Sequence, residues 1–536
     1  MVKYLLYVFV GLTSLISAAA NADDPRPNIL LIIADDLGYT DLGSYGGEIS
    51  TPSLDALAYA GLRFTGFHTA SACQQVRSML MSGRGFKHVI RRMPPRDDGE
   101  RQHQLRTDVA ILPELLQTAG YRTYLAGKWD LGLTPETLPI ARGFDRSFTL
   151  LEASSSHFAE YFWDNVSYYQ EDDHHVPLAD LPEDFYSTRS YTDKILEYIT
   201  AHPDDAPWFS MLTYTAPHWP LQVPDNWLDR YSGRYDEGYD VLREQRVSRA
   251  IDIGVIPPGA SLDRFRPIAT PWADLPTKLQ RRYSRAQEIY AAMTELLDGE
   301  VGRIVKHLES REQLDNTVIL FLSDHGASAA EIGIKDGPTS MPDHFDTLEA
   351  ARNNAINNFG RMNSFIDHGQ GFGEAATAPL RYFKGTLAEG ALRAPAFIHF
   401  PPAIAGGKIS HSFVTVMDIL PTFLEIAEAD EPGDMEIDGR DIQPLVGRSF
   451  WSLVTGQVDT VHDESSVAGW SRDPFGALIR GRYKLVNQTM PGQQSNETPP
   501  WQLFDIVADP GETHDIAATF PSIVEELDAI WRRDWQ

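Results

Sequence analysis

The sequence predicts an α/β fold: a large, mixed, mostly parallel sheet sandwiched by helices, with a smaller α+β domain at the carboxyl end. Three observations predict this fold. Apolar runs rich in β-branched residues alternate with helical patterns over most of the chain. The length of 536 residues is sufficient for one large core with additions. Beyond about residue 440, short strand patterns joined by turns replace the long alternation.

The first strand is expected at Asn28–Ala34, where a continuous apolar run is typical of a strand buried on both faces. A helix should follow, with Thr51 as its N-cap and Pro52 in its first turn, and should continue through Leu62. Later apolar runs predict strands at Thr123–Gly127, Trp208–Tyr214, Thr317–Ser323 and Ala394–Phe400. Helical periodicity predicts helices at Ile111–Ala119, Tyr191–Thr200, Ser284–Leu308 and Met417–Ala427.

The end of the chain should form a smaller domain with three short strands and a helix. These elements are expected at Ala477–Arg480, Tyr483–Val486, Trp501–Phe504 and Ser522–Trp531. A stretch rich in Arg, Asp and Pro, residues 219–282, has weak periodicity and is interpreted as an insertion near the site. The predicted division is therefore a leader at 1–22, an α/β domain at 23–440 that contains this insertion, and an α+β domain at 441–536.

The first 22 residues have the pattern of a secretory signal peptide. Lys3 provides the positive start, 5–16 the apolar stretch, and Ala20-Asn21-Ala22 the small residues of a cleavage site. The alternative is an uncleaved amino-terminal anchor, but the apolar stretch is short for a bilayer. We expect an exported protein, periplasmic or secreted, that has no membrane segment after cleavage. Cleavage would remove one cation and no acid, which changes the formal net charge from −29 to −30.

This acidity argues against nucleic acid as a partner, because phosphate backbones are bound by basic surfaces. An anionic substrate would need local cations within its own site. Cys73 is the single cysteine, so an internal disulfide is excluded. Taken alone, a lone cysteine is most often a buried small apolar residue.

Polar side chains follow several of the predicted strands, and in α/β sheets ligands bind beyond the carboxyl ends of the strands. Adjacent carboxylates repel each other unless a cation or a proton lies between them, although a solvated turn is the alternative for such a pair. The residues that these strand ends should bring together are Asp35, Asp36, Lys128, His218, Asp324 and His325.

A series of ordered motifs resembles the sulfatases of the alkaline-phosphatase-like superfamily, and among them the bacterial arylsulfatases. The opening motif runs from Pro27 through Asp35-Asp36-Leu37-Gly38 to Thr51-Pro52-Ser53-Leu54-Asp55. The later motifs are Cys73 to Arg84, Gly127-Lys128-Trp129, Ala216-Pro217-His218-Trp219-Pro220, Ser323-Asp324-His325-Gly326, Lys384 with Glu389-Gly390, Arg393-Ala394-Pro395, and Asp509-Pro510-Gly511-Glu512. The similarity extends from about residue 25 to the end of the chain.

The resemblance implies sulfate ester hydrolysis by a formylglycine derived from Cys73, together with one divalent metal, calcium in many members. The implied metal ligands are Asp35, Asp36, Asp324 and His325, with the hydroxyl of residue 73. Arg77 would steady the nucleophile, Lys128 and Lys384 would hold sulfate oxygens, and His218 would protonate the leaving oxygen. The implied partners are a small sulfate ester and a formylglycine-generating enzyme.

Three positions depart from the family pattern. Gln75 stands where the modification motif has Pro or Ala, which removes a feature that the modifying enzyme recognises. Asp130 replaces a histidine; it could still accept a proton, but it adds negative charge where an anion must bind. His325 replaces the common asparagine and favours manganese or zinc over calcium.

Three functions therefore remain open at this point. The first is an arylsulfatase-type hydrolase. The second is a zinc- or manganese-dependent hydrolase of phosphodiesters or phosphonate esters. The third is a catalytically impaired protein that binds a sulfated ligand. His68 is interpreted as packing around the cysteine loop, and His157, His174 and His175 as loop residues rather than ligands.

Overall fold

The structure, a computed structural model, describes residues 26–535 except 94–102, 163–165, 204–205, 258–266, 336–347, 494–497 and several positions within 431–443. The expected leader at 1–22 lies outside the described residues. Among the residues described, no helix combines the length and the apolar character that a bilayer crossing requires.

A ten-stranded sheet forms the centre of the molecule. In spatial order its strands are β13 (Lys408–Ser410), β2 (Leu62–Phe64), β12 (Ala396–His399), β11 (Thr317–Ser323), β1 (Asn28–Ala34), β10 (Trp208–Thr213), β6 (Arg122–Lys128), β7 (Arg146–Leu150), β8 (Tyr169–Glu171) and β9 (His174–Val176). The central strands from β11 to β7 run parallel, and antiparallel strands β12 and β8 flank them. The predicted mixed, mostly parallel sheet is confirmed.

Strand β1 occupies the middle of this sheet, between β10 and β11. Its side chains alternate between two cores: Leu30 and Ile32 belong to one, and Ile29 and Leu31 to the other. A strand with a hydrophobic core on each face must be apolar at every position, which explains the uninterrupted run in the sequence.

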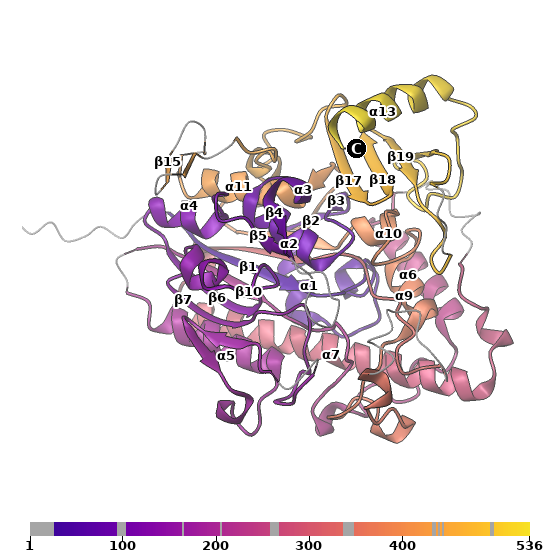
Figure 1. Ribbon diagram of the computed structural model, residues 1–536, viewed down its shortest axis with the longest axis horizontal. Coiled ribbons are helices and arrows are strands. Elements are labelled where there is room, and N and C mark those ends of the chain that lie inside the picture. The colour runs from indigo at the N-terminus through magenta and orange to yellow at the C-terminus, as the bar shows by residue number, and fades with distance from the viewer. Residues whose placement is uncertain are drawn as a thin grey trace, which may run out of the picture.

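Helices cover both faces of the sheet (Figure 1). One face carries α1 (Pro52–Ala60), α5 (Ser187–Thr200) and α7 (Thr277–Ser310), with α6 (Tyr239–Asp252) and α9 (Gly369–Thr377) beside them. The other face carries α2 (Cys73–Ser82), α3 (Phe86–Val89), α4 (Leu112–Thr118), α11 (Ile419–Ile426) and α12 (Trp451–Val454). The short helix α10 (Glu389–Leu392) lies ahead of β12, and three two-stranded sheets pair β3 (Phe67–His68) with β14 (Val414–Thr415), β4 (Ile90–Arg92) with β5 (His103–Leu105), and β15 (Glu436–Ile437) with β16 (Arg440–Asp441).

The first helix begins as predicted, with Thr51 at the N-cap and Pro52 as its first residue, but it ends earlier. The Thr51 hydroxyl does not accept a backbone N–H of α1; it donates to Asp55 Oδ2 at 3.1 Å and accepts from the Gly43 N–H. The helix ends at Ala60 rather than Leu62, because Leu62 begins β2 and pairs with Ile398. A Cβ on the intervening Gly61 would lie 2.1 Å from the Ile398 carbonyl oxygen, so only glycine fits this junction.

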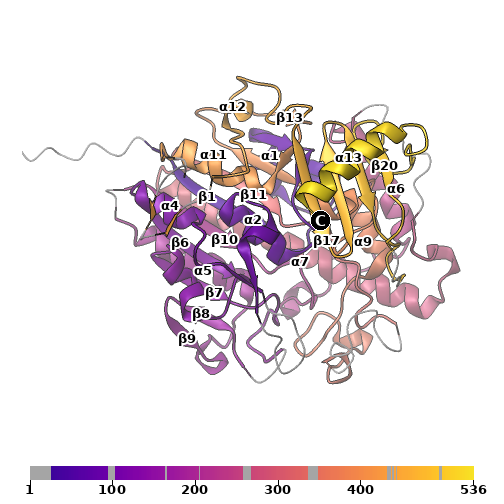
Figure 2. The same cartoon turned by 45° about the horizontal axis from the view of Figure 1, so that its top comes forward.

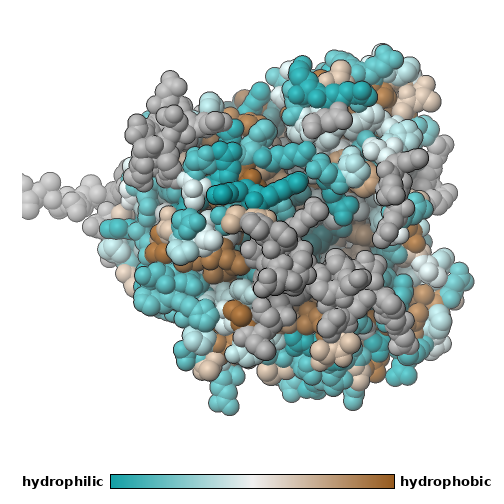
Figure 3. Space-filling model, in the orientation of Figure 1, coloured by the Kyte–Doolittle hydropathy of each residue, from teal (hydrophilic) through white to brown (hydrophobic). Residues whose placement is uncertain are grey.

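The chain ends in a four-stranded antiparallel sheet, covered by a helix, that packs beside the large sheet (Figure 2). Its elements are β17 (Val467–Arg472), β18 (Phe475–Arg480), β19 (Tyr483–Asn487), β20 (Gln502–Asp505) and α13 (Pro521–Asp534). The predicted strands and helix are present, and β17 is an additional strand that the sequence did not reveal. On the face in Figure 3, hydrophilic side chains predominate, which agrees with the acidic composition. The boundary between domains at 441 stays a prediction.

Candidate active site

The residues predicted at the strand ends converge beyond the carboxyl edge of the sheet. Asp35 and Asp36 follow β1, Asp324 and His325 follow β11, and Lys128 is the last residue of β6. His218 follows β10, Cys73 is the first residue of α2, and Lys384 lies between α9 and α10. All are buried except Lys384, whose side chain is 19% exposed. The strand-end argument is therefore confirmed in its geometry.

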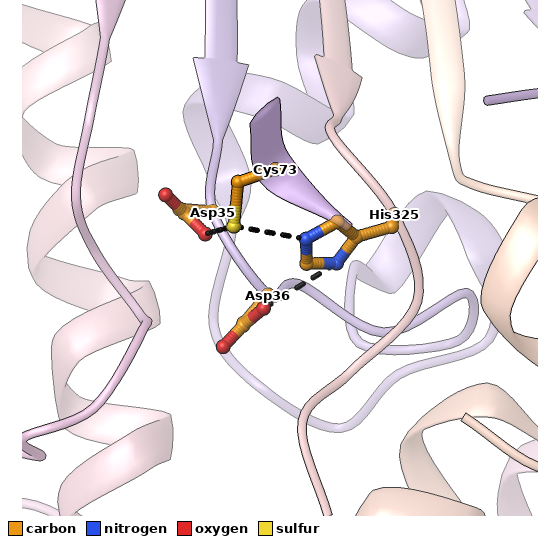
Figure 4. Close-up of side chains that lie close together, drawn as sticks. All are labelled: Asp35, Asp36, Cys73 and His325. Atoms are coloured by element: carbon orange, nitrogen blue, oxygen red, sulfur yellow. Dashed lines mark hydrogen bonds and ion pairs between the residues drawn. The ribbon is translucent and has the colours of Figure 1, made fainter. Parts of the chain in front are cut away.

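Four of these side chains form a compact ligand set (Figure 4). One donor atom from each of Asp35, Asp36, Cys73 and His325 lies within 4.8 Å of the other three. Cys73 Sγ is 3.2 Å from His325 Nε2 and 3.5 Å from Asp35 Oδ1. Asp324 lies beside the set, with Oδ2 3.4 Å from His325 Nε2.

Three cations surround the carboxylates. Lys128 Nζ donates to Asp35 Oδ2 at 2.5 Å, and Arg77 Nη2 donates to the same oxygen at 3.3 Å. Lys384 Nζ donates to Asp36 Oδ1 at 2.7 Å. Although burial alone would raise it, Lys128 and the other nearby positive groups hold the pKa of Asp35 well below its usual value. These side chains supply the local positive charge that an anion site requires in a strongly acidic protein.

Both histidines of the site direct an unprotonated nitrogen inward. His325 Nδ1 lies 3.0 Å from the Gly326 carbonyl oxygen, and His218 Nδ1 lies 2.6 Å from the Trp219 carbonyl oxygen. A carbonyl oxygen only accepts hydrogen bonds, so Nδ1 carries the hydrogen in each ring and Nε2 presents its lone pair. Burial lowers the pKa of both rings well below the usual value, which keeps them neutral.

The donor set fits a divalent cation. Asp36 Oδ2 and Asp324 Oδ2 are buried and accept no hydrogen bond from any described residue. Asp36 Oδ2 lies 3.5 Å from His218 Nε2, and Asp324 Oδ2 lies 3.4 Å from His325 Nε2, so each oxygen also faces an imidazole lone pair. Burial, with neighbouring carboxylates, raises the pKa of Asp36 and raises that of Asp324 to about 7. Lone pairs and carboxylates that face one another require a shared positive charge.

Asp130 lies at the same edge, two residues beyond β6. Its backbone is in the left-handed region, with φ of 54°, and its peptide is held by Leu151 and by the Gln74 amide. Burial raises the pKa of the Asp130 carboxyl above its usual value, while Lys128 and Arg77 oppose that shift. The substitution at this position therefore adds an acid next to the cations of the site.

The sequence indicated no role for His157 beyond that of a loop residue. This side chain is buried: its Nε2 lies 3.0 Å from the His218 carbonyl oxygen and its Nδ1 lies 2.8 Å from Ser187 Oγ. His157 therefore holds the backbone carbonyl of His218, the candidate general acid. His174 and His175 lie in strand β9 rather than in a loop, because they pair with Glu171 and Gln170 of β8; the His174 side chain is 84% exposed.

Burial lowers the pKa of His157 to about 4. The unfolded chain takes up a proton at this residue below about pH 6.5, whereas the folded protein does so only near pH 4. We expect His157 to remove about 3 kcal/mol from the free energy of unfolding as the pH falls through this window. Urea unfolding of the wild type and of His157→Gln at pH 7 and pH 4.5 measures the difference. His174→Gln is the matched control, and equal pH dependence in all three proteins would contradict the assignment.

A buried charge network connects the carboxyl-terminal sheet to the loop ahead of Cys73. Glu389 on α10 accepts from Lys484 Nζ of β19 at 2.8 Å and contacts His68 Nε2 at 3.0 Å. Lys484 also pairs with Glu512 at 3.0 Å, and a Glu512 oxygen accepts from the Glu389 N–H. All four side chains are almost completely buried. His68 thus packs at the cysteine loop as expected, and Glu389 links it to Lys484 of the carboxyl-terminal sheet.

Comparison with known proteins identifies the family. The sequence profile described as Sulfatase matches residues 27–429, and the profile described as N-sulphoglucosamine sulphohydrolase, C-terminal matches residues 380–529. An uncharacterized sulfatase of Schizosaccharomyces pombe is 37% identical over 95% of this chain and 93% of its own length. The arylsulfatase of Klebsiella aerogenes is 33% identical over 82% of this chain and 94% of its own length.

Solved structures show the same fold. Ps i-CgsB in complex with k-i-k-neocarrahexaose aligns with a TM-score of 0.66 at 23% identity, over 95% of this chain and 93% of that chain. The phosphonate monoester hydrolase of Agrobacterium radiobacter aligns with a TM-score of 0.57 at 18% identity, over 95% of each chain. The ordered motifs, the mixed sheet and the profile match over most of the length agree, and the chain belongs to the sulfatase family.

Proposed function

We propose that this protein hydrolyses sulfate esters at the site beyond β1 and β11. The observation that carries the proposal is the ligand set of two aspartates, a cysteine and a histidine, with buried carboxylate oxygens that no described residue satisfies. Family membership supports the same reaction class. The fold alone would not, because one fold hosts many reactions.

Asp35, Asp36, Asp324 and His325 would hold one divalent metal, with residue 73 as a further ligand. When bound, this ion would neutralise sulfate oxygens and lower the pKa of an attacking hydroxyl. The imidazole of His325 favours manganese or zinc, whereas the carboxylates also suit calcium. Because its ligands come from two adjacent parallel strands, the ion would fix the ends of β1 and β11 relative to each other.

The remaining residues would bind the substrate and move protons. Lys128 and Lys384 would contact sulfate oxygens, and Arg77 would orient residue 73; the contacts of these cations with Asp35 and Asp36 support the proposal. His218 would first take up a proton from water at Nε2 and then deliver it to the departing oxygen; because burial lowers the pKa of this ring, the protonated form releases its proton readily. Asp130 would accept the proton that the nucleophile loses.

Without a bound cation, the environment of Cys73 disfavours a thiolate. Burial and the charge of Asp35 raise the pKa of the Cys73 thiol, so without a cation the thiol stays protonated at neutral pH. A thiol in that state is a weak nucleophile. Oxidation of Cys73 to formylglycine by a generating enzyme would instead provide a hydroxyl at the same position, and the unusual Gln75 makes that modification the first point to test.

The charge of the site favours singly charged esters. Its four carboxylates, Asp35, Asp36, Asp130 and Asp324, outnumber its three cations, Arg77, Lys128 and Lys384, by one. With a divalent ion bound and all four carboxylates ionised, the net charge of the site would be +1, and a sulfate monoester carries one negative charge. A phosphodiester or a phosphonate monoester carries about the same charge, which keeps a hydrolase of those esters as the second candidate. The similarity in fold to a phosphonate monoester hydrolase also favours it.

The test is a substrate and metal screen on protein from its native source, with residue 73 identified by peptide mass spectrometry. We expect formylglycine at residue 73 and turnover of 4-nitrophenyl sulfate with manganese or calcium. The rate should exceed that with 4-nitrophenyl phosphate at least about tenfold, because about 1.4 kcal/mol of charge mismatch gives that ratio. Asp130→Asn should lower the ratio of the sulfate rate to the phosphate rate, because a more positive site favours the more highly charged phosphate ester.

Each other outcome selects a different function. Preference for a phosphodiester or a phosphonate monoester would overturn the sulfatase in favour of the second candidate. Binding of a sulfated ligand without turnover under any metal would identify the third, an impaired binding protein. We also propose that the mature chain is exported to the periplasm or secreted; amino-terminal sequencing of the native protein, with a start at Asp23, tests this.

A further inference from the structure

The backbone of Asp36 adopts an uncommon conformation. Its φ of 67° lies in the left-handed region, which costs a non-glycine residue energy unless its surroundings hold it there. Three consecutive peptide N–H groups are held by side chains. That of Asp36 donates to Asp324 Oδ1 at 3.2 Å, that of Leu37 to Ser323 Oγ at 3.1 Å, and that of Gly38 to Asp41 Oδ2 at 2.6 Å. The direction of a proposed metal ligand therefore depends on these acceptors.

Asp41 and Tyr290 form the part of this clamp that lies away from the ligand set. Tyr290, on α7, has its hydroxyl 2.6 Å from Asp41 Oδ2 and 3.1 Å from the Asp36 carbonyl oxygen. The same hydroxyl accepts from the Gly38 N–H at 3.3 Å. The Asp41 carboxylate and the Tyr290 hydroxyl thus hold the Gly38 N–H, and the same hydroxyl contacts the Asp36 carbonyl oxygen. Both side chains are fully or almost fully buried.

The countercharge for this buried carboxylate comes from α6. Arg246 is completely buried, and its Nη1 donates to Asp41 Oδ1 at 2.5 Å. Its Nε and Nη2 donate to the two oxygens of Glu48 at 2.7 and 2.9 Å. A buried carboxylate that loses its cation is strongly unfavourable, so Asp41 can hold the loop only while Arg246 is present. Helix α6 belongs to the stretch 219–282, outside the strand-and-helix alternation.

We propose that Arg246 is a positioning residue for the metal site, acting through Asp41 and Tyr290 on the left-handed backbone of Asp36. The inference rests on the proposed function only in taking Asp36 as a metal ligand. Arg246 contacts Asp41 and Glu48, not a member of the ligand set. Residues of this kind orient a ligand, and their loss characteristically lowers metal affinity by about tenfold to a hundredfold.

The test measures metal affinity directly, by isothermal titration calorimetry of the full chain with manganese, zinc and calcium. Tyr290→Phe removes only the hydroxyl, Arg246→Met removes the charge, and Arg246→Lys restores the charge without the forked geometry. We expect the dissociation constant to rise at least about tenfold in Arg246→Met. Tyr290→Phe should weaken binding in the same direction, and Arg246→Lys should recover part of the loss.

Arg230→Met is the matched control, because Arg230 lies in the same stretch and pairs with Glu295 of α7, but its side chain is 57% exposed. Its dissociation constant should stay within about twofold of the wild type. If the wild type binds none of the three metals, the proposed function fails and this inference fails with it. If the wild type binds and the variants bind equally well, only the positioning role is overturned. Should Arg246→Met fail to fold, folded Tyr290→Phe with unchanged affinity overturns it by itself.

Discussion

Replacing Cys73 by alanine lowers turnover of 4-nitrophenyl sulfate by at least about a thousandfold, as the loss of a nucleophile does in other enzymes. Cys73 is the only cysteine of the chain, and it starts α2 with its sulfur against Asp35 and His325. Either formylglycine or a metal-bound thiolate at this position would carry the reaction, so both forms predict the same loss. Steady-state rates at saturating metal are the measurement.

The control for this variant lies on the same helix. Ser82→Ala removes a buried hydroxyl that donates to the Ser78 carbonyl oxygen at the other end of α2. Its kcat should remain within about threefold of the wild type, because its hydroxyl donates within the helix, away from the ligand set. A Cys73→Ala protein that is folded and retains a tenth or more of the wild-type rate would exclude residue 73 as the nucleophile.

The second large effect is on stability. Lys484→Met should lower the free energy of unfolding by about 3–5 kcal/mol, because it leaves the buried carboxylates of Glu389 and Glu512 without their common cation. Although burial would raise it, Lys484 and His68 hold the pKa of Glu389 well below its usual value. Urea unfolding monitored by tryptophan fluorescence measures the loss, and Trp470 reports on the affected region through its bond to the Thr69 carbonyl oxygen.

Arg480→Met provides the comparison. Arg480 pairs with Glu526 between β18 and α13, but the Glu526 side chain is 57% exposed, so solvent screens this pair and it should contribute little to the free energy of unfolding. Equal destabilisation by the two variants would show that the network around Glu389 does not hold the carboxyl-terminal sheet more strongly than an ordinary surface pair does.

The sequence predicted those parts of the site that follow from strand ends. A run such as 317–323 has a clear beginning and end, and β11 occupies that range, so the strand pattern alone was enough to place Asp324 and His325 beside Asp35 and Asp36. Family motifs then added Cys73, Arg77 and Lys384, which lie on a helix and a loop. The structure brings all of them to the same edge, while their chemical roles remain proposals.

The residues that hold the site from outside could not be predicted in the same way. Arg246, Glu389 and Lys484 are completely buried, although charged residues in a sequence normally indicate surface. Their partners lie far away in the chain: Arg246 and Asp41 are 205 positions apart, and Lys484 and Glu389 are 95 apart. Periodicity reports only local order, so it gave α6 no signal beyond a polar stretch and gave His157 no signal at all.

The central position of β1 has a consequence for biosynthesis. Among the strands of the large sheet β1 is synthesised before the others, yet its neighbours are β10, 180 positions later, and β11, 289 positions later, by the pairs Ile29 with Phe209 and Ile29 with Val318. Contacts of such long range form late in folding. Until residue 323 has been synthesised, β11 cannot pair with β1, and the edge of the sheet against which Cys73 is buried is incomplete. An enzyme that must reach this thiol meets it most readily on the growing, unfolded chain.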